Sequence, residues 1–203
     1  GTEGDFAAIQ VFELPTFEQV GEWQHNMTPM NQQIRILQGI NKHIHDTIIE
    51  QDSQASPQIF YSMENNTIGE AALMRVMDIG EENIEGMFLS EPIRKGHRRK
   101  FRRGFNTTAK FKIDACTKFK ELVEGGKMKI NSQLLISELK DFVATGLSYK
   151  AKPGQHDDLV MSCLLMTRMM KVLADFDPKI FEKWTDRSSE LTTPMPIFGN
   201  FYG

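Results

Sequence analysis

The chain has 203 residues, of which 40% are hydrophobic and 25% are charged, so it is long enough to bury a sizeable core as one domain. No stretch approaches the roughly 18 uninterrupted apolar residues of a membrane span, and no basic region followed by an apolar core marks a secretory signal. The two cysteines, Cys116 and Cys163, lack metal-binding or disulfide spacing and are expected to be reduced, buried thiols. We therefore expect no membrane partner.

The net charge of −3 conceals a strong asymmetry along the chain. Nine Lys or Arg residues and no acid lie between positions 94 and 112, which leaves 15 basic and 27 acidic residues, or −12, elsewhere. Such a concentrated positive segment favours contact with a polyanion, although a solvated loop or a localisation-like run would have the same composition. The predicted DNA-contacting residues are Arg94, Lys95, Arg98, Arg99, Lys100, Arg102, Arg103, Lys110 and Lys112.

The first half of the chain predicts a hairpin, a helix and a buried strand. Strand-forming residues over Phe6–Leu14 and Gln19–His25 predict an antiparallel hairpin. The pair Thr28-Pro29 predicts a helix start, with Thr as the cap and Pro at the first helical position. The segment Gln58–Met63 has almost no polar alternation, which is typical of a central strand covered on both faces.

The second half alternates between helices and short strands. Helices are expected over about 68–77, from Thr107 or Thr108 to Glu124, from a Ser132 cap to about Val143, and from Asp157 onward; strands are expected over 85–90, 127–130 and 147–151. This order predicts an α/β domain in which helices flank a mixed sheet. The residues after Asp177 are expected to form a peripheral tail.

Three acidic residues stand where elements of such a domain converge. The sequence Gly154-Gln155-His156-Asp157-Asp158 leads into a mostly apolar helix, and Glu64 directly follows the buried strand. Open α/β sheets bind ligands at strand ends, and carboxylates are suitable ligands for Mg²⁺. Two such ions activate water and stabilise the leaving oxygen in phosphodiester hydrolysis. We expect Glu64, Asp157 and Asp158 to form a metal-dependent nuclease site, with Asp5 able to join them.

Each acid also has a purely structural interpretation. Glu64 with Asn65 and Asn66 could form a solvated turn, and Asp157 could simply cap its helix. His156 is expected to be a structural or substrate-side group rather than a ligand, and Asn65 a supporting residue.

The motifs resemble those of a known family, the C-terminal nuclease domain of the large terminase subunit of tailed bacteriophages, closest to the T-even type. The resemblance is carried by residues 1–5, by Tyr61-Ser62-Met63-Glu64-Asn65-Asn66-Thr67-Ile68-Gly69, by Gly154-Gln155-His156-Asp157-Asp158-Leu159-Val160-Met161-Ser162 and by the helix ending at Glu124. It covers residues 1–175, which are expected to form an RNase H-like nuclease domain, with 176–203 as the peripheral tail.

The resemblance implies two Mg²⁺ or Mn²⁺ ions, with Glu64 and Asp157 as primary ligands and Asp5 and Asp158 as supporting acids. It also implies cleavage of concatemeric double-stranded DNA at the viral procapsid in the host cytoplasm. The expected partners are an upstream ATPase domain, the capsid portal and the small terminase subunit. No G-x-x-x-x-G-K-[ST] motif occurs in this chain, so the ATPase would lie outside it.

One family feature has no counterpart in the sequence. The family's first catalytic Asp would fall a few residues before Gly1. The resemblance therefore implies that this chain cuts poorly by itself, unless Asp5 partly substitutes for the missing ligand. Two other functions stay open: a junction resolvase or transposase-type nuclease, and a non-catalytic DNA-binding or docking module in which the acids are only caps.

Overall fold

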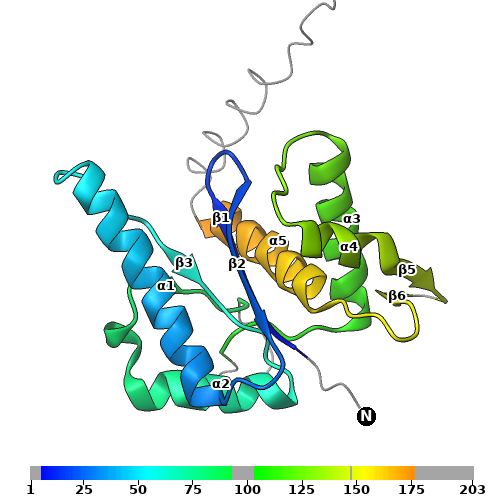
Figure 1. Ribbon diagram of the computed structural model, residues 1–203, viewed down its shortest axis with the longest axis horizontal. Helices are drawn as coiled ribbons and strands as arrows, with labels where there is room; N and C mark the ends of the chain where they lie inside the picture. The colour runs from blue at the N-terminus through cyan, green and yellow to red at the C-terminus, as the bar shows by residue number, and fades with distance from the viewer. Residues whose placement is uncertain (1–5, 93–102, 147, 177–203) are drawn as a thin grey trace, which may run out of the picture.

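The computed structural model describes residues 6–92, 103–146 and 148–176, which form helices around a long central helix, α5 (Asp158–Phe176). Figure 1 shows α5 behind the hairpin of β1 (Ala7–Glu13) and β2 (Glu18–His25). Strand β1 packs on α5, and helices α3 (Ala109–Glu124) and α4 (Gln133–Asp141) pack on it as well. Helix α5 thereby connects the hairpin with the second half of the chain.

The N-terminal hairpin confirms the sequence prediction. Strands β1 and β2 pair antiparallel from Ala7 opposite His25 to Glu13 opposite Glu18, with one irregularity in register between Val11 and Phe12.

Helix α1 (Met30–Gln51) begins differently from the prediction. Pro29 is the capping residue rather than the first helical residue, and its carbonyl accepts hydrogen bonds from the backbone N–H groups of Gln32 and Gln33. The Thr28 hydroxyl makes no cap, because it lies 2.8 Å from a ring nitrogen of His25. The expected Thr cap is therefore wrong, although the helix itself is confirmed.

The predicted buried strand is present in a shorter form. Strand β3 (Phe60–Tyr61) pairs in parallel with β4 (Met87–Phe88). Extended backbone pairing continues past β3, because the N–H of Phe105 donates to the carbonyl of Met63 at 3.1 Å and the N–H of Asn65 donates to the carbonyl of Phe105 at 2.7 Å. The chain therefore reaches Glu64 in an extended conformation.

Side-chain caps start the three middle helices. Helix α2 (Thr67–Ile79) is capped by Asn66, α3 by Thr108 and α4 by Ser132; each cap oxygen accepts an N–H from the first helical turn. A 3₁₀ turn, η1 (Glu81–Asn83), follows α2. The cap types at α3 and α4 confirm the prediction from Thr and Ser positions.

The end of α4 and the sheet differ from expectation. Helix α4 stops at Asp141, because Phe142–Thr145 forms β5, which pairs antiparallel with β6 (Ser148–Ala151). Aromatic and β-branched residues favour strand over helix there. The expected strand over 127–130 is reduced to a single parallel bridge between Lys129 and Glu18.

The strands of the described part of the chain form three two-stranded sheets rather than one continuous mixed sheet. Three of the pairing regions are too short to extend a sheet: β3 and β4 pair over two residues, and the Lys129 and Glu64 bridges are single contacts. The mixed α/β class is confirmed; the continuity of the sheet is not.

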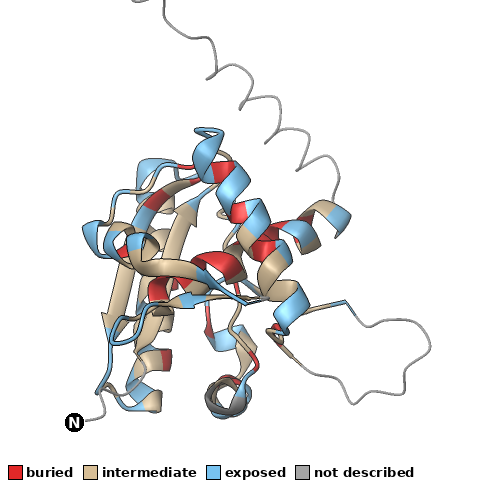
Figure 2. Ribbon diagram, turned by 90° about the vertical axis from the view of Figure 1, so that its right-hand side faces the viewer, coloured by how far each residue is buried: buried red, intermediate tan, exposed pale blue. Residues whose placement is uncertain are grey.

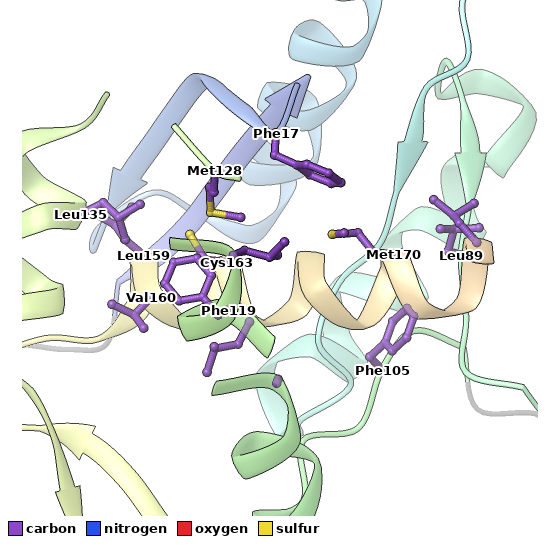
Figure 3. Close-up of a cluster of buried hydrophobic side chains, with 14 residues drawn as sticks. Phe17, Leu89, Phe105, Phe119, Met128, Leu135, Leu159, Val160, Cys163 and Met170 are labelled. Atoms are coloured by element: carbon purple, nitrogen blue, oxygen red, sulfur yellow. The ribbon is translucent and has the colours of Figure 1, made fainter. Parts of the chain in front are cut away.

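The main core follows α5. Figure 3 shows Leu135 and Met128 near Leu159 and Cys163 at one end, and Leu89 and Phe105 near Met170 at the other. Buried residues gather on the inward sides of the helices, while the outer faces are exposed (Figure 2).

A smaller cluster joins α1, β3 and α2 through Ile34, Tyr61, Val76 and Ile84. Both cysteines are free thiols on helices; Cys163 is buried as predicted, whereas Cys116 is only partly buried. Burial raises the pKa of the Cys116 thiol to about 11. Among the helices in the described ranges, none has the length and apolarity that a bilayer crossing requires.

Candidate active site

Asp157 and Asp158 lie at the N-terminus of α5, but Glu138 caps that helix. The backbone N–H groups of Leu159 and Val160 both donate to one carboxylate oxygen of Glu138, at 2.9 and 3.2 Å. Glu138 comes from α4 and accepts a further hydrogen bond from the Gln24 side chain. An anion at a helix N-terminus satisfies free N–H groups and the helix dipole. Glu138 therefore performs the capping role that Asp157 could have taken.

Burial sets the protonation behaviour of Glu138. Desolvation is the largest influence and raises the pKa of this carboxyl, while the hydrogen bonds from Gln24 and the two α5 amides lower it. Asp157 raises it slightly further through charge repulsion. No sequence pattern indicates this role, because a Glu inside another helix carries no capping signature.

The Asp157 carboxylate turns away from α5. Its Oδ2 accepts the backbone N–H of Ala151 at 3.2 Å and lies 3.7 Å from the Nζ of Lys112. Both contacts fall on the same oxygen, and 26% of the side chain is exposed. A plain helix cap does not describe this carboxylate, and its partial exposure is compatible with a ligand role.

Asp158 lies beside the start of the first strand. Its Oδ2 accepts the backbone N–H of Phe6 at 3.4 Å and is 3.8 Å from Nδ1 of His156. The His156 ring makes an edge-to-face contact with Phe6, with centroids 4.7 Å apart. His156 thus contacts Asp158 and the residue that precedes β1, and its structural or substrate-side role stays a prediction.

Glu64 is held at the end of the β3 extension. It forms a parallel bridge with Phe105, and its Oε2 accepts the side-chain amide of Asn66 at 3.2 Å. Asn65 is buried and donates from Nδ2 to the carbonyl of Arg103 at 2.9 Å. Asn65 therefore anchors the backbone next to Glu64, and the solvated-turn interpretation does not describe Asn65. Its supporting role in the site stays a prediction.

Gly69 allows α2 to start directly against Glu64. A Cβ built at Gly69 would overlap the Glu64 carbonyl oxygen, which no side chain tolerates. We expect Gly69→Ala to lower the free energy of unfolding by about 1–3 kcal/mol, because backbone must shift to admit the methyl group.

The matched control is Gly39→Ala in α1, where nothing lies within 4 Å of the added Cβ. This change should raise stability by about 0.5–1 kcal/mol, since Ala is the better residue inside a helix. Urea unfolding of both variants measures the difference. If Gly69→Ala and Gly39→Ala had the same free energy of unfolding, Gly69 would not restrict the approach of α2 to Glu64.

Arg168 is a largely buried cation that sequence reasoning missed. It pairs with Glu91, and its guanidinium lies 5.0 Å from the Phe105 ring centroid and 4.7 Å from that of Phe111. Burial lowers its pKa, and the charge of Glu64 opposes that shift. The sequence feature that could have indicated this role is a single Arg in the apolar stretch of α5. A cation removed from water requires an acidic partner, so such an Arg predicts an ion pair.

The predicted basic residues have different surroundings. Positions 94–102 lie outside the described residues, as does Asp5; the predicted contacts among them are Arg94, Lys95, Arg98, Arg99, Lys100 and Arg102. Arg103 pairs with Glu81, Lys110 is exposed on α3, and Lys112 is mostly buried beside Asp157. Their contact with DNA stays a prediction.

Asp157 and Asp158 are consecutive in the chain, and their carboxylates contact different partners. The charge of Glu64 acts on Arg168, farther along α5. Within the described ranges, no three His, Cys, Asp or Glu side chains form a group that could hold a metal ion. Asp157 and Asp158 are adjacent hard oxygen donors that remain partly exposed, which fits a divalent ion sharing its ligands with water and phosphate. Joint coordination by Glu64 and Asp157 stays a prediction.

The chain has the fold of a phage terminase nuclease. No model of a known protein family matches its sequence. Among solved structures, the large terminase nuclease of thermophilic phage G20c is similar with a TM-score of 0.51 and 19% identity over 81% of this chain and 75% of that chain. The same nuclease with bound magnesium is similar with a TM-score of 0.52 and 18% identity over the same shares. The magnesium belongs to that protein.

Proposed function

We propose that this chain is the metal-dependent nuclease domain of a viral DNA-packaging terminase. The observation that carries the proposal is the Asp157–Asp158 pair, which leaves the capping of α5 to Glu138 in a fold shared with a terminase nuclease. The magnesium in that nuclease supports a divalent ion here. The RNase H-like class, the T-even type and the use of two Mg²⁺ or Mn²⁺ ions rest on the motif resemblance.

The proposed roles follow from where each residue lies. Glu64, Asp157 and Asp158 would hold the divalent ions, and Asp5 would add a supporting acid. Bound ions supply an activated water and stabilise the leaving oxygen of the phosphodiester. The backbone N–H of Ala151 orients Asp157, that of Phe6 orients Asp158, and the Phe105 pairing fixes the backbone at Glu64.

The ends of the basic segment support delivery of DNA to this site. The residues that flank the segment are hydrogen-bonded to each other. The backbone N–H of Glu91 donates to the carbonyl of Gly104 at 3.1 Å, and the Ser90 hydroxyl accepts the N–H of Gly104 at 3.1 Å. The next residue, Phe105, is the bridge partner of Glu64. The described residues on either side of the segment thus adjoin the bridge partner of Glu64, and contact of the segment with DNA phosphates, with release of counterions, is proposed from its charge.

The biological setting follows from the same proposal. The substrate is concatemeric double-stranded DNA, cut at the procapsid in the host cytoplasm. The upstream ATPase domain, the portal and the small terminase subunit are the partners.

Nicking of a supercoiled plasmid tests the proposal. We expect nicking with Mg²⁺ or Mn²⁺ and none with EDTA, and faster nicking when residues upstream of Gly1 supply the further acid that the resemblance implies. Absence of nicking in both forms, with intact folding, would contradict a nuclease. Strong preference for four-way junctions over linear duplex would replace the terminase assignment with a resolvase.

A non-catalytic DNA-binding module is the second candidate, favoured by the absence of a three-ligand group within the described ranges. It predicts salt-sensitive DNA binding that is independent of divalent ions. Measured binding of Mn²⁺ that requires Asp157 would reject it.

A further inference from the structure

Lys112 lies against the carboxylate that the proposed function assigns to a metal ion. Its Nζ is 3.7 Å from Oδ2 of Asp157, and only 16% of the Lys112 side chain is exposed. Lysine is rarely buried to this extent without an acidic partner, since removal of its charge from water is costly. Asp157 is the acid paired with it.

Two further contacts hold this pair in place. The Nζ of Lys112 lies 5.4 Å from the ring centroid of Phe142 in β5, within cation–π range. The Oδ2 of Asp157 is fixed by the backbone N–H of Ala151 in β6, the residue that pairs with Phe142. One β-hairpin thus positions both the ammonium and the carboxylate.

The contacts of Oδ2 place a metal ion in competition with Lys112. This oxygen accepts the backbone N–H of Ala151 and lies beside the Lys112 ammonium. A divalent ion that takes Oδ2 of Asp157 as a ligand replaces the ammonium there, because two cations in contact with one oxygen repel each other.

We propose that Lys112 occupies the Asp157 carboxylate in the metal-free protein, competes with the divalent ion and transfers to a DNA phosphate when the ion binds. This inference rests on the proposed function, because it assigns Asp157 to the metal. Because a DNA phosphate then pairs with the Lys112 ammonium, DNA offsets the free-energy cost of separating Lys112 from Asp157 and so favours metal binding. By thermodynamic linkage, metal binding strengthens DNA binding by the same factor.

Mn²⁺ affinity of the metal-free chain tests the competition, measured from free Mn²⁺ by electron paramagnetic resonance at low ionic strength. We expect Lys112→Gln to tighten Mn²⁺ binding about 5–10-fold in the absence of DNA, in the range of ordinary couplings between sites. A short duplex should tighten Mn²⁺ binding by a similar factor in the unsubstituted chain and have little effect in the variant. A misfolded variant would bind Mn²⁺ more weakly, so tighter Mn²⁺ binding cannot result from misfolding.

Three further variants separate the outcomes. Lys112→Met keeps a long unbranched side chain without the charge and should also tighten binding, whereas Lys112→Arg retains the charge and should not. Lys118→Gln removes an exposed charge from the same helix and should leave Mn²⁺ affinity unchanged. Unchanged or weaker Mn²⁺ binding in folded Lys112→Gln and Lys112→Met would overturn the inference.

Asp157→Asn distinguishes this failure from failure of the proposed function. If this variant binds Mn²⁺ as well as the unsubstituted chain, the metal assignment of Asp157 is wrong, and the competition is wrong with it. If Asp157→Asn weakens binding but Lys112→Gln has no effect, only the competition is rejected.

Discussion

Asp157→Asn and Glu64→Gln should each slow Mg²⁺-dependent nicking by at least about 100-fold, equivalent to about 2.7 kcal/mol of transition-state stabilisation. The amide keeps the shape of the side chain and removes the negative charge that a divalent ion requires. Asparagine at 157 can still accept the Ala151 N–H through its oxygen, so the local backbone should be retained. Nicking rates at saturating Mg²⁺ measure the effect.

Matched controls are available on the two helices that follow these acids, α5 after Asp157 and α2 after Glu64. Asp175→Asn changes an exposed acid of α5, and Glu70→Gln changes an exposed acid in the first turn of α2. Neither should alter nicking by more than about twofold, because each is a surface charge whose effect is screened. Undiminished cutting by both Asp157→Asn and Glu64→Gln would rule out the proposed nuclease site.

Local signals made much of the fold predictable. Thr108 and Ser132 precede apolar periodicity, and both cap helices as the sequence indicates. The strand-forming residues of the N-terminal hairpin likewise need only their immediate neighbours to pair. These predictions succeeded because propensity, capping and turns act over a few residues.

Long-range packing decided the remainder. Phe142 follows α4 without a stop signal, and its strand conformation depends on pairing with Ala151 and stacking on Tyr149. Glu138 caps α5 from a distance of 21 residues along the chain, which no local pattern can indicate. For the candidate site, sequence motifs selected Asp157 and Asp158, while the roles of Glu138 and Arg168 required the folded arrangement.

The stability of the fold around Glu64 should depend strongly on the aromatic ring of Phe105. This side chain is 1% exposed, belongs to the main core and forms one face of the Arg168 stack. We expect Phe105→Ala to lower the free energy of unfolding by about 3–5 kcal/mol, because it loses buried area and leaves a cavity. Phe105→Leu should cost less, since it fills most of the space.

Urea unfolding of the two variants measures this order, and the slope of the transition should stay unchanged if the native state remains compact. The exposed residue Met74 on α2 offers a control, because Met74→Ala removes a side chain that is already 66% exposed. A loss below about 1 kcal/mol for Phe105→Ala would mean that the ring is dispensable to the core. A loss of about 3–5 kcal/mol would mean that the ring holding the backbone beside Glu64 also stabilises the core. Phe105 pairs its backbone with Met63 and Asn65, on either side of Glu64.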